Sequence, residues 1–132
     1  MVNVEFLIVT YLVSLFVDWI FQWDWQAVNK SKWSKNDNKI FSLLALLTHS
    51  ATYAAITTLI VAMIMNLSAY NIYIMYIVLL ISHAIIDTRI PVKLIMKFKG
   101  MKDDQINFGF MHIGIDHRLH ELVILILSMI IS

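Results

Sequence analysis

The residues of this chain that are best suited to chemistry are acidic and imidazole side chains spaced four positions apart. His83 and Asp87 form such a pair near the end of a long apolar run. On a helix this spacing places both side chains on one face, so they point into whatever that face meets. An ionised carboxylate is unfavourable in hydrocarbon unless a cation, a metal or water accompanies it. The pair therefore predicts a partner that completes a polar site.

Three other segments could provide that partner. Asp18 precedes Gln22 by four positions, His49 lies in another apolar stretch, and Asp116 precedes His120 by four positions. The chain has no cysteine, so imidazole, carboxylate or carbonyl groups would have to hold any metal. This donor set suits a divalent ion such as Zn, Mn or Fe, bound singly or as a pair.

The composition places these residues in a membrane. The 132 residues are 60% hydrophobic and 14% charged, and the mean hydropathy is +0.75, which is too apolar for a soluble domain of this size. The apolar segments are near the ~20 residues that a crossing helix needs. We expect a single integral membrane domain over residues 1–132, folded as an all-α, up-down bundle of four transmembrane helices. The predicted spans are about 4–22, 40–66, 72–90 and 108–131.

The first segment has a competing interpretation as a cleavable signal peptide. It lacks a basic start and a small-residue cleavage site, and it ends in Asp18 followed by a cluster of tryptophans. Interfacial aromatic residues of this kind are typical of the end of a transmembrane helix. We therefore interpret the segment as the first span.

The lysines predict the orientation of the bundle. All of them lie in the expected loops at 23–39 and 91–107, and none lies near the termini or in the turn at 66–71. Under the positive-inside rule both loops are cytoplasmic and both termini lie on the non-cytoplasmic side. We expect a multi-pass protein of the cell's inner membrane. Residues 23–39 are expected to be a loop in water, whereas 92–107 could be a segment lying on the membrane surface or a solvated loop.

An up-down order of these helices would bring the polar groups to one depth. His49 lies nine residues after the start of the second span and Asp116 eight residues after the start of the fourth. Each would be roughly 12 Å from its helix end at ~1.5 Å per residue. His83 lies at a similar depth in the third span, and Asp18 is somewhat nearer the end of the first. The spacing therefore predicts one polar layer near the cytoplasmic face.

The leading interpretation is a metal-dependent hydrolase. A bound divalent ion lowers the pKa of a coordinated water to about 7 and so provides hydroxide at neutral pH. Asp18 and Asp116 are the candidate catalytic acids, with Asp18 as general base or further ligand, and Gln22 would orient the substrate or a water. We expect a small phosphorylated or lipid-linked substrate, attracted by the lysine-rich loops, and no nucleic-acid partner. The predicted metal ligands are His49, His83, Asp87, Asp116 and His120.

Two other classes of protein remain open. In a channel or carrier the same residues would pass cations or protons, but transport needs polar residues along both halves of the membrane, and residues 123–131 are almost wholly apolar. A homo-oligomer could still form a pore between its subunits, which would not need a polar path through a single chain. In an accessory subunit the polar layer would only lock the helix packing. His117 and Arg118 are expected to face away from the layer, with Arg118 able to pair with Glu121.

The order of these motifs along the chain resembles a known family. The segment from Asp18 to Lys30, then His49, His83-x-x-x-Asp87 and Asp116-His117-x-x-His120 is similar to small bacterial and phage inner-membrane proteins described as a domain of unknown function. The resemblance covers nearly the whole chain and implies a four-helix membrane fold with a shared polar cluster.

A more distant resemblance connects the chain with a reaction. The His49-Ser50 pair and the His-x-x-x-Asp step are similar to membrane-bound proteins named as metal-dependent hydrolases. The closer family commonly shows Asp-Gln where this chain has Asp116-His117, so we do not assign position 117 to the site.

Overall fold

The computed structural model describes residues 1–30, 38–101 and 109–131, without the side chains of 109–112. Within this part of the chain the structure is helical and contains no strand, so the all-α prediction is confirmed. The helices are α1 (Val4–Ile20), α2 (Asp24–Asn29), α3 (Lys39–Met65), α4 (Ala69–Asp87), α5 (Ile90–Phe98) and α7 (Gly109–Ile130).

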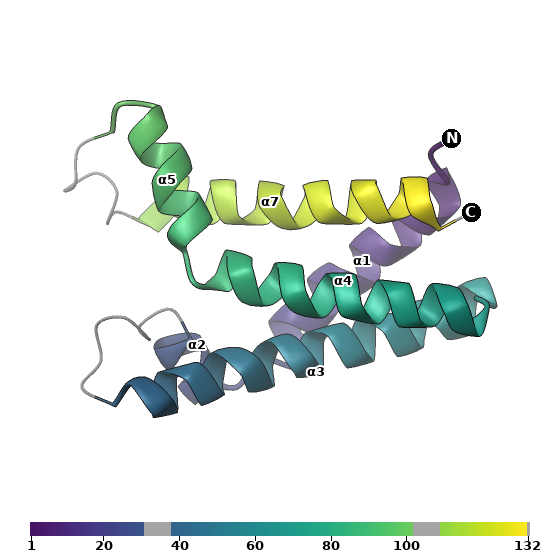
Figure 1. Ribbon diagram of the computed structural model, residues 1–132, viewed down its shortest axis with the longest axis horizontal. Coiled ribbons are helices and arrows are strands. Elements are labelled where there is room, and N and C mark those ends of the chain that lie inside the picture. Colours follow the sequence, from purple (N-terminus) through teal and green to yellow (C-terminus); the bar gives the residue numbers. More distant parts are fainter. Residues whose placement is uncertain (31–37, 102–108, 132) are drawn as a thin grey trace.

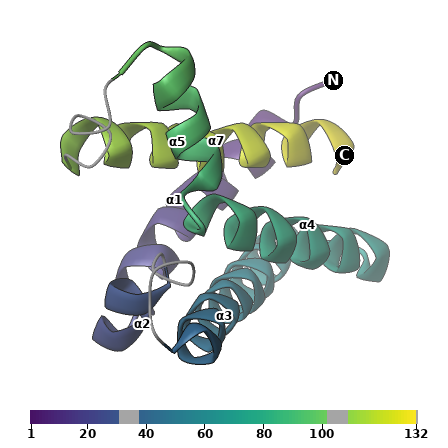
Figure 2. The same ribbon diagram turned by 60° about the vertical axis from the view of Figure 1, so that its left-hand side comes forward.

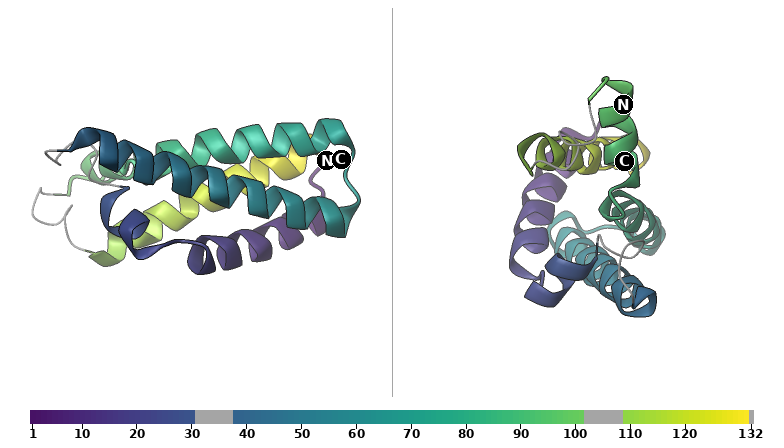
Figure 3. Two further views of the ribbon diagram at one scale, coloured as in Figure 1. Left: turned by 90° about the horizontal axis from the view of Figure 1, so that it is seen from below. Right: turned by 90° about the vertical axis from the view of Figure 1, so that its left-hand side faces the viewer.

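The long helices α1, α3, α4 and α7 run alternately in opposite directions (Figure 1). The two termini and the α3–α4 turn lie at one end of the bundle, and α2 and α5 lie at the other (Figure 3). A backbone hydrogen bond joins the ends of the chain, since the N–H of Asn3 donates to the carbonyl of Ser128 over 2.8 Å. The expected up-down order is therefore present.

Short polar residues determine where these helices begin and end. The side chains of Asn3, Asn38 and Ser68 each accept a hydrogen bond from a backbone N–H in the first turn of α1, α3 and α4. Such caps satisfy donors that a helix leaves unpaired at its start. Asn66 ends α3 in the left-handed conformation, with φ of 54°, which asparagine tolerates better than most residues.

The third long helix, α4, begins at Ala69 and not at the predicted residue 72, so the predicted turn over 66–71 is shorter. It also ends before its predicted boundary at residue 90, and a separate helix follows. Arg89 has φ of 61°, and Pro91 lies in the first turn of α5, where its missing N–H costs nothing. α5 leaves α4 at a steep angle (Figure 2). Val92 and Met96 are fully buried, and they pack against the α7 side chains Ile115 and Leu119. A solvated loop is therefore wrong for 90–98.

The expectation of a loop in water over 23–39 is also wrong for its first part. Residues Asp24–Asn29 form α2, and the backbone N–H of Trp23 donates to Oε1 of Gln26 over 3.0 Å, half of a capping box. Gln26 is buried, and its Nε2 donates to Oγ1 of Thr48 on α3 over 3.2 Å. Packing against α3 thus stabilises a helix in a segment whose polar composition predicted a loop. Residues 31–37 lie outside the described part of the chain.

In the described chain, α3 and α4 are the helices long and apolar enough to cross a membrane, judged by length and composition. α1 has 17 residues, about 26 Å at ~1.5 Å per residue, slightly short of a hydrocarbon core of about 30 Å. α7 is long enough but carries Asp116, Arg118 and Glu121. The four-span arrangement therefore stays a prediction.

The buried interior of the bundle has two parts. The part toward the termini is apolar and is built around fully buried residues such as Phe6, Val61, Met75 and Leu127. The part toward α2 and α5 contains His49, His83 and Asp87, all buried. Helix α3 contributes to both, because His49 lies in the polar part and Ala54 and Val61 belong to the apolar cluster.

Candidate metal centre

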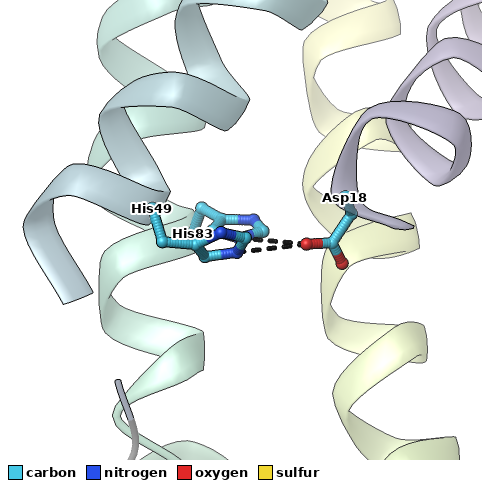
Figure 4. A group of neighbouring side chains, drawn as sticks. All are labelled: Asp18, His49 and His83. Atoms are coloured by element: carbon cyan, nitrogen blue, oxygen red, sulfur yellow. Dashed lines mark hydrogen bonds and ion pairs between the residues drawn. The ribbon is translucent and has the colours of Figure 1, made fainter. Parts of the chain in front are cut away.

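Three helices bring the centre of the site together. His49 on α3 and His83 on α4 are buried, and their Nε2 atoms lie 2.9 Å apart. Asp18, near the end of α1, directs its carboxylate at both rings (Figure 4). Its Oδ1 is 3.1 Å from Nε2 of His49 and 3.7 Å from Nε2 of His83. Residues far apart in the sequence thus meet in one polar cluster.

The second carboxylate of the cluster is Asp87, on the same face of α4 as His83. Its Oδ2 lies 3.3 Å from Nε2 of His83 and 3.4 Å from Nε2 of His49. On α7, His120 directs Nε2 toward Oδ1 of Asp87 at 4.0 Å and toward Oδ2 of Asp116 at 3.9 Å. We call Asp18, His49, His83, Asp87, Asp116 and His120 the Asp/His cluster.

Lys30 belongs to the site although the sequence interpretation left it in a solvated loop. It follows α2 directly, and its Nζ lies 2.9 Å from Oδ2 of Asp87 and 3.0 Å from Nε2 of His49. Its side chain is 14% exposed. The spacing of four residues places Lys30 and Gln26 on one face of a helix, but only the packing of α2 against α3 turns that face inward.

The atoms around the imidazoles lie at distances that a metal ion could bridge, although the same groups also pair with one another and with Lys30. A ring nitrogen makes one hydrogen bond, yet Nε2 of His49 has four polar atoms between 2.9 and 3.4 Å away. Ligand atoms of a tetrahedral zinc site are about 3.3 Å apart when the metal–nitrogen distance is about 2.0 Å. Two overlapping groups have ligand atoms within 4.8 Å of one another, namely Asp18, His49, His83 and His83, Asp87, His120.

Several buried polar atoms of the cluster lack a hydrogen-bond partner within the described residues. They include Nε2 of His120 and the Nδ1 atoms of His49 and His83. A neutral imidazole with its proton on Nδ1 keeps the lone pair of Nε2 available for a metal. Metal-binding histidines usually donate this proton to a carboxylate or carbonyl, and these two rings depart from that pattern.

An aromatic side chain fixes the orientation of His83. The ring of Tyr53, one turn after His49 on α3, stacks on His83 with centroids 3.8 Å apart and an angle of 20° between the planes. The ring of His120 is 4.5 Å from that of His83 and 6.3 Å from that of Tyr53. Tyr53 is not among the predicted site residues, although its spacing from His49 places it on the same helix face.

The three aspartates differ in exposure. Asp87 is 4% exposed, whereas Asp18 and Asp116 are 30% and 28% exposed. The two more accessible acids are those predicted to be catalytic. Asp87 is enclosed by His49, His83 and Lys30, which suits a ligand or counterion better than a group that exchanges protons with substrate.

Gln22 is not joined to the cluster by any contact of the described residues. α1 ends at Ile20, so Gln22 lies beyond the helix, and its buried Nε2 has no hydrogen-bond partner in that part of the chain. Its substrate-orienting role stays a prediction. Arg118 pairs with Glu121 as expected, whereas His117 lines a small cavity together with Asp18 and His120.

Comparisons with known proteins give no relative from which a function could be transferred. No family model, no curated protein sequence and no solved structure matches this chain. The resemblance to the membrane families therefore depends on the motifs alone, and the function has to be argued from the Asp/His cluster.

Proposed function

We propose that this chain is a multi-pass protein of the inner membrane that binds one divalent metal ion in the Asp/His cluster and hydrolyses a phosphorylated or lipid-linked substrate. The observation that carries the proposal is the convergence of ring nitrogens and carboxylate oxygens. The Nε2 atoms of His49 and His83 lie 2.9 Å apart, and each lies 3.1–3.7 Å from one oxygen of Asp18 and one of Asp87. Buried ionisable groups within an apolar bundle are functional by default.

The outer surface of the bundle supports a membrane location. Large apolar side chains are exposed on every long helix, whereas a soluble protein rarely exposes a large contiguous apolar patch. The share of the apolar window that is buried is 50% in α3 and 22% in α4. Lipid would cover the residues of these two windows that are not buried inside the bundle. Examples on α1, α3, α4 and α7 are Leu12, Phe16, Leu43, Leu47, Leu59, Ile81, Ile85, Leu122 and Ile126.

The charge of the site supports a divalent cation. With neutral histidines, Asp18, Asp87 and Asp116 together with Lys30 leave a formal charge of −2. A divalent ion would neutralise this charge in an environment where uncompensated charge is costly. One ion suits the geometry better than two, because His83 contacts both Asp18 and Asp87 through the same Nε2.

The residues of the site have complementary roles in hydrolysis. When bound, the metal would supply a Lewis acid and a water of lowered pKa. His49, His83, Asp87 and His120 would hold it, and Asp18 would take the proton of the attacking water. The water oxygen would bond to the phosphoryl or acyl centre, and the bond to the leaving oxygen would break. The proton that Asp18 took from the water would return to the leaving oxygen through the Asp116 carboxylate.

Metal analysis tests the proposal directly. The purified protein is incubated in detergent with Zn²⁺, Mn²⁺ or Fe²⁺ in turn, freed of excess ion and analysed by mass spectrometry for metals. We expect one ion per chain for at least one metal, and none in a variant carrying both His49→Ala and His83→Ala. A folded wild-type protein that retains no ion would overturn the proposal.

A second candidate function is a non-enzymatic membrane subunit in which the cluster only locks the helices together. Lys30 favours it, because its ammonium already pairs with Asp87 and contacts His49. In this case added metal would change neither the stability nor the composition of the purified protein. A channel has less support, because the interior toward the termini contains an apolar cluster and, among the described residues, its buried polar groups are hydroxyls such as those of Thr10 and Thr57 and not charged side chains.

A further inference from the structure

A small cavity lies beside the Asp/His cluster. Its volume is about 20 Å³, enough for one water molecule. Asp18 and His120 belong to its lining, together with Tyr53, which stacks on His83. A water or a reacting group in this cavity would therefore lie next to two of the predicted site residues.

The same cavity borders a larger groove on the outside of the bundle. The groove, of about 530 Å³, lies between α1 and α7, and we call it the α1–α7 groove. Tyr11, Glu121 and Ile124 line both the cavity and the groove. These side chains are therefore the wall between the cluster and the surface that would face lipid.

Polar contacts hold this wall closed. The hydroxyl of Tyr11 on α1 donates to Oε1 of Glu121 on α7 over 3.4 Å, a long hydrogen bond. The other oxygen of Glu121 pairs with Arg118, whose side chain is 79% exposed. A group that engages Arg118 would compete with Glu121 and weaken the closure.

We propose that the substrate is a long-chain phosphate monoester that reaches the Asp/His cluster sideways from the bilayer through the α1–α7 groove. The inference rests on the proposed function and specifies its substrate class and its route. The remaining lining of the groove, with Leu7, Ile8, Leu122 and Leu125, is apolar and suits a hydrocarbon chain. Arg118 at the rim suits the phosphate, since a guanidinium binds phosphate oxygens in a bidentate manner.

The phosphate also provides a reason for the wall to open. Once Arg118 binds phosphate oxygens, Glu121 loses its cationic partner, and its hydrogen bond to Tyr11 becomes the remaining contact of the closure. Movement of Tyr11 would then join the groove to the cavity that Asp18 and His120 line. The phosphoryl group would reach the cluster while the chain stays in the groove.

A second groove provides an internal control. It has about 590 Å³ and lies between α5 and α7, lined by Ile95, Lys99 and Arg118 among others. It is also apolar with cations at its edge, and it shares Arg118 and Leu122 with the α1–α7 groove. It shares no lining residue with the cavity beside the cluster. An amphiphile bound there has no route to the metal ligands.

Photo-crosslinking to the metal-free protein in nanodiscs separates the two grooves. The probe is a dodecyl phosphate with a diazirine in the middle of its chain, and peptide mass spectrometry locates the adducts. We expect adducts on residues 7–8, 11 and 124–125, which line the α1–α7 groove and not the other. Ile8→Trp fills the α1–α7 groove and should lower the yield about tenfold, whereas Ile95→Trp fills the other groove and should leave it unchanged. Leu125→Trp is a second variant for the first groove in case Ile8→Trp does not fold.

Arg118 provides the test of the headgroup. Arg118→Gln should reduce crosslinking of the phosphate about tenfold, which is the loss of one charge-assisted contact, and should not affect a matched diazirine dodecanol. Adducts confined to the α5–α7 groove, or equal losses in Ile8→Trp and Ile95→Trp, would overturn the inference. If the protein binds metal but gives no adducts in the α1–α7 groove, the proposed route is wrong and the proposed function stands. If the adducts form but the protein binds no metal, the proposed function is wrong and the groove stands as a binding site.

Discussion

The two parts of the interior use the same helices for different purposes. Toward the termini, residues such as Phe6, Val61 and Leu127 fill the space between helices with hydrocarbon and leave little room for a ligand. Toward α2 and α5, the same helices contribute imidazoles and carboxylates that crowd around His49 and His83. An apolar interior stabilises the bundle wherever it lies, whereas charged groups need a specific partner to be tolerated.

The comparison teaches that stability and metal binding should be separable. The apolar part fixes the distances between helices, and the polar part depends on those distances without providing most of the packing. Substitutions in the apolar part should therefore change mainly the free energy of unfolding. Substitutions in the polar part should change mainly the affinity for metal.

The largest effect is expected in the apolar part. Leu127 is fully buried, so Leu127→Ala leaves a cavity and should lower the free energy of unfolding by about 2–5 kcal/mol. Unfolding in mixed detergent micelles, followed by circular dichroism, measures this change. Metal bound per folded chain should equal that of the wild type, and a loss of metal at temperatures where the variant is folded would contradict the separation.

The next effect is the loss of metal in the polar part. His83 belongs to both possible ligand groups, so His83→Ala should reduce metal affinity about 100-fold or more. Titration calorimetry with the metal identified by the elemental analysis gives the affinity. The matched control is Ser82→Ala, because the Ser82 hydroxyl donates to the carbonyl of Val78 on its own helix. A similar loss of metal affinity in both variants would mean that the substitutions distort α4 and that the effect of His83→Ala is not the removal of a ligand.

Removing the lysine should have a smaller effect of opposite sign. The ammonium of Lys30 lies next to Asp87 and His49, so it competes with a metal for the same atoms. Lys30→Met should raise metal affinity about tenfold, equal to about 1.4 kcal/mol. Lys93→Met, on α5, controls for the loss of one positive charge.

The same variant distinguishes the two candidate functions. Without metal, Lys30→Met leaves the buried carboxylate of Asp87 without its cationic partner and should lower the unfolding temperature. If the cluster binds metal, adding the ion restores that temperature. If the cluster is only an internal ion pair, the unfolding temperature of Lys30→Met stays low with every metal tested.

The smallest perturbation tests whether the two ends of the bundle face opposite sides of a membrane. Because the chain contains no cysteine, single cysteines can be introduced at Ser68, in the α3–α4 turn, and at Lys99, after α5. An impermeant maleimide should label Ser68→Cys in spheroplasts and Lys99→Cys in inverted vesicles. Labelling of both positions from the same side would refute the transmembrane arrangement and leave the two interior parts without a membrane to separate them.

Local sequence determined much of this protein. The apolar runs predicted the starts of α1 and α3 to within one residue, whereas the predicted start of the third span at residue 72 missed the cap at Ser68 and the start of α4 at Ala69. Helical spacing was enough to pair His83 with Asp87 and Arg118 with Glu121. The common depth of His49, His83 and Asp18 also followed from helix lengths and an alternating order.

Only the tertiary structure decided which groups touch. The position of Lys30 beside Asp87 depends on α2 folding back against α3, and the Tyr11–Glu121 contact depends on how α1 lies against α7. Periodicity gives the direction of a side chain about its own helix axis. It gives neither the distance between two helices nor their rotation relative to each other, because these are set by the packing of side chains from the whole bundle.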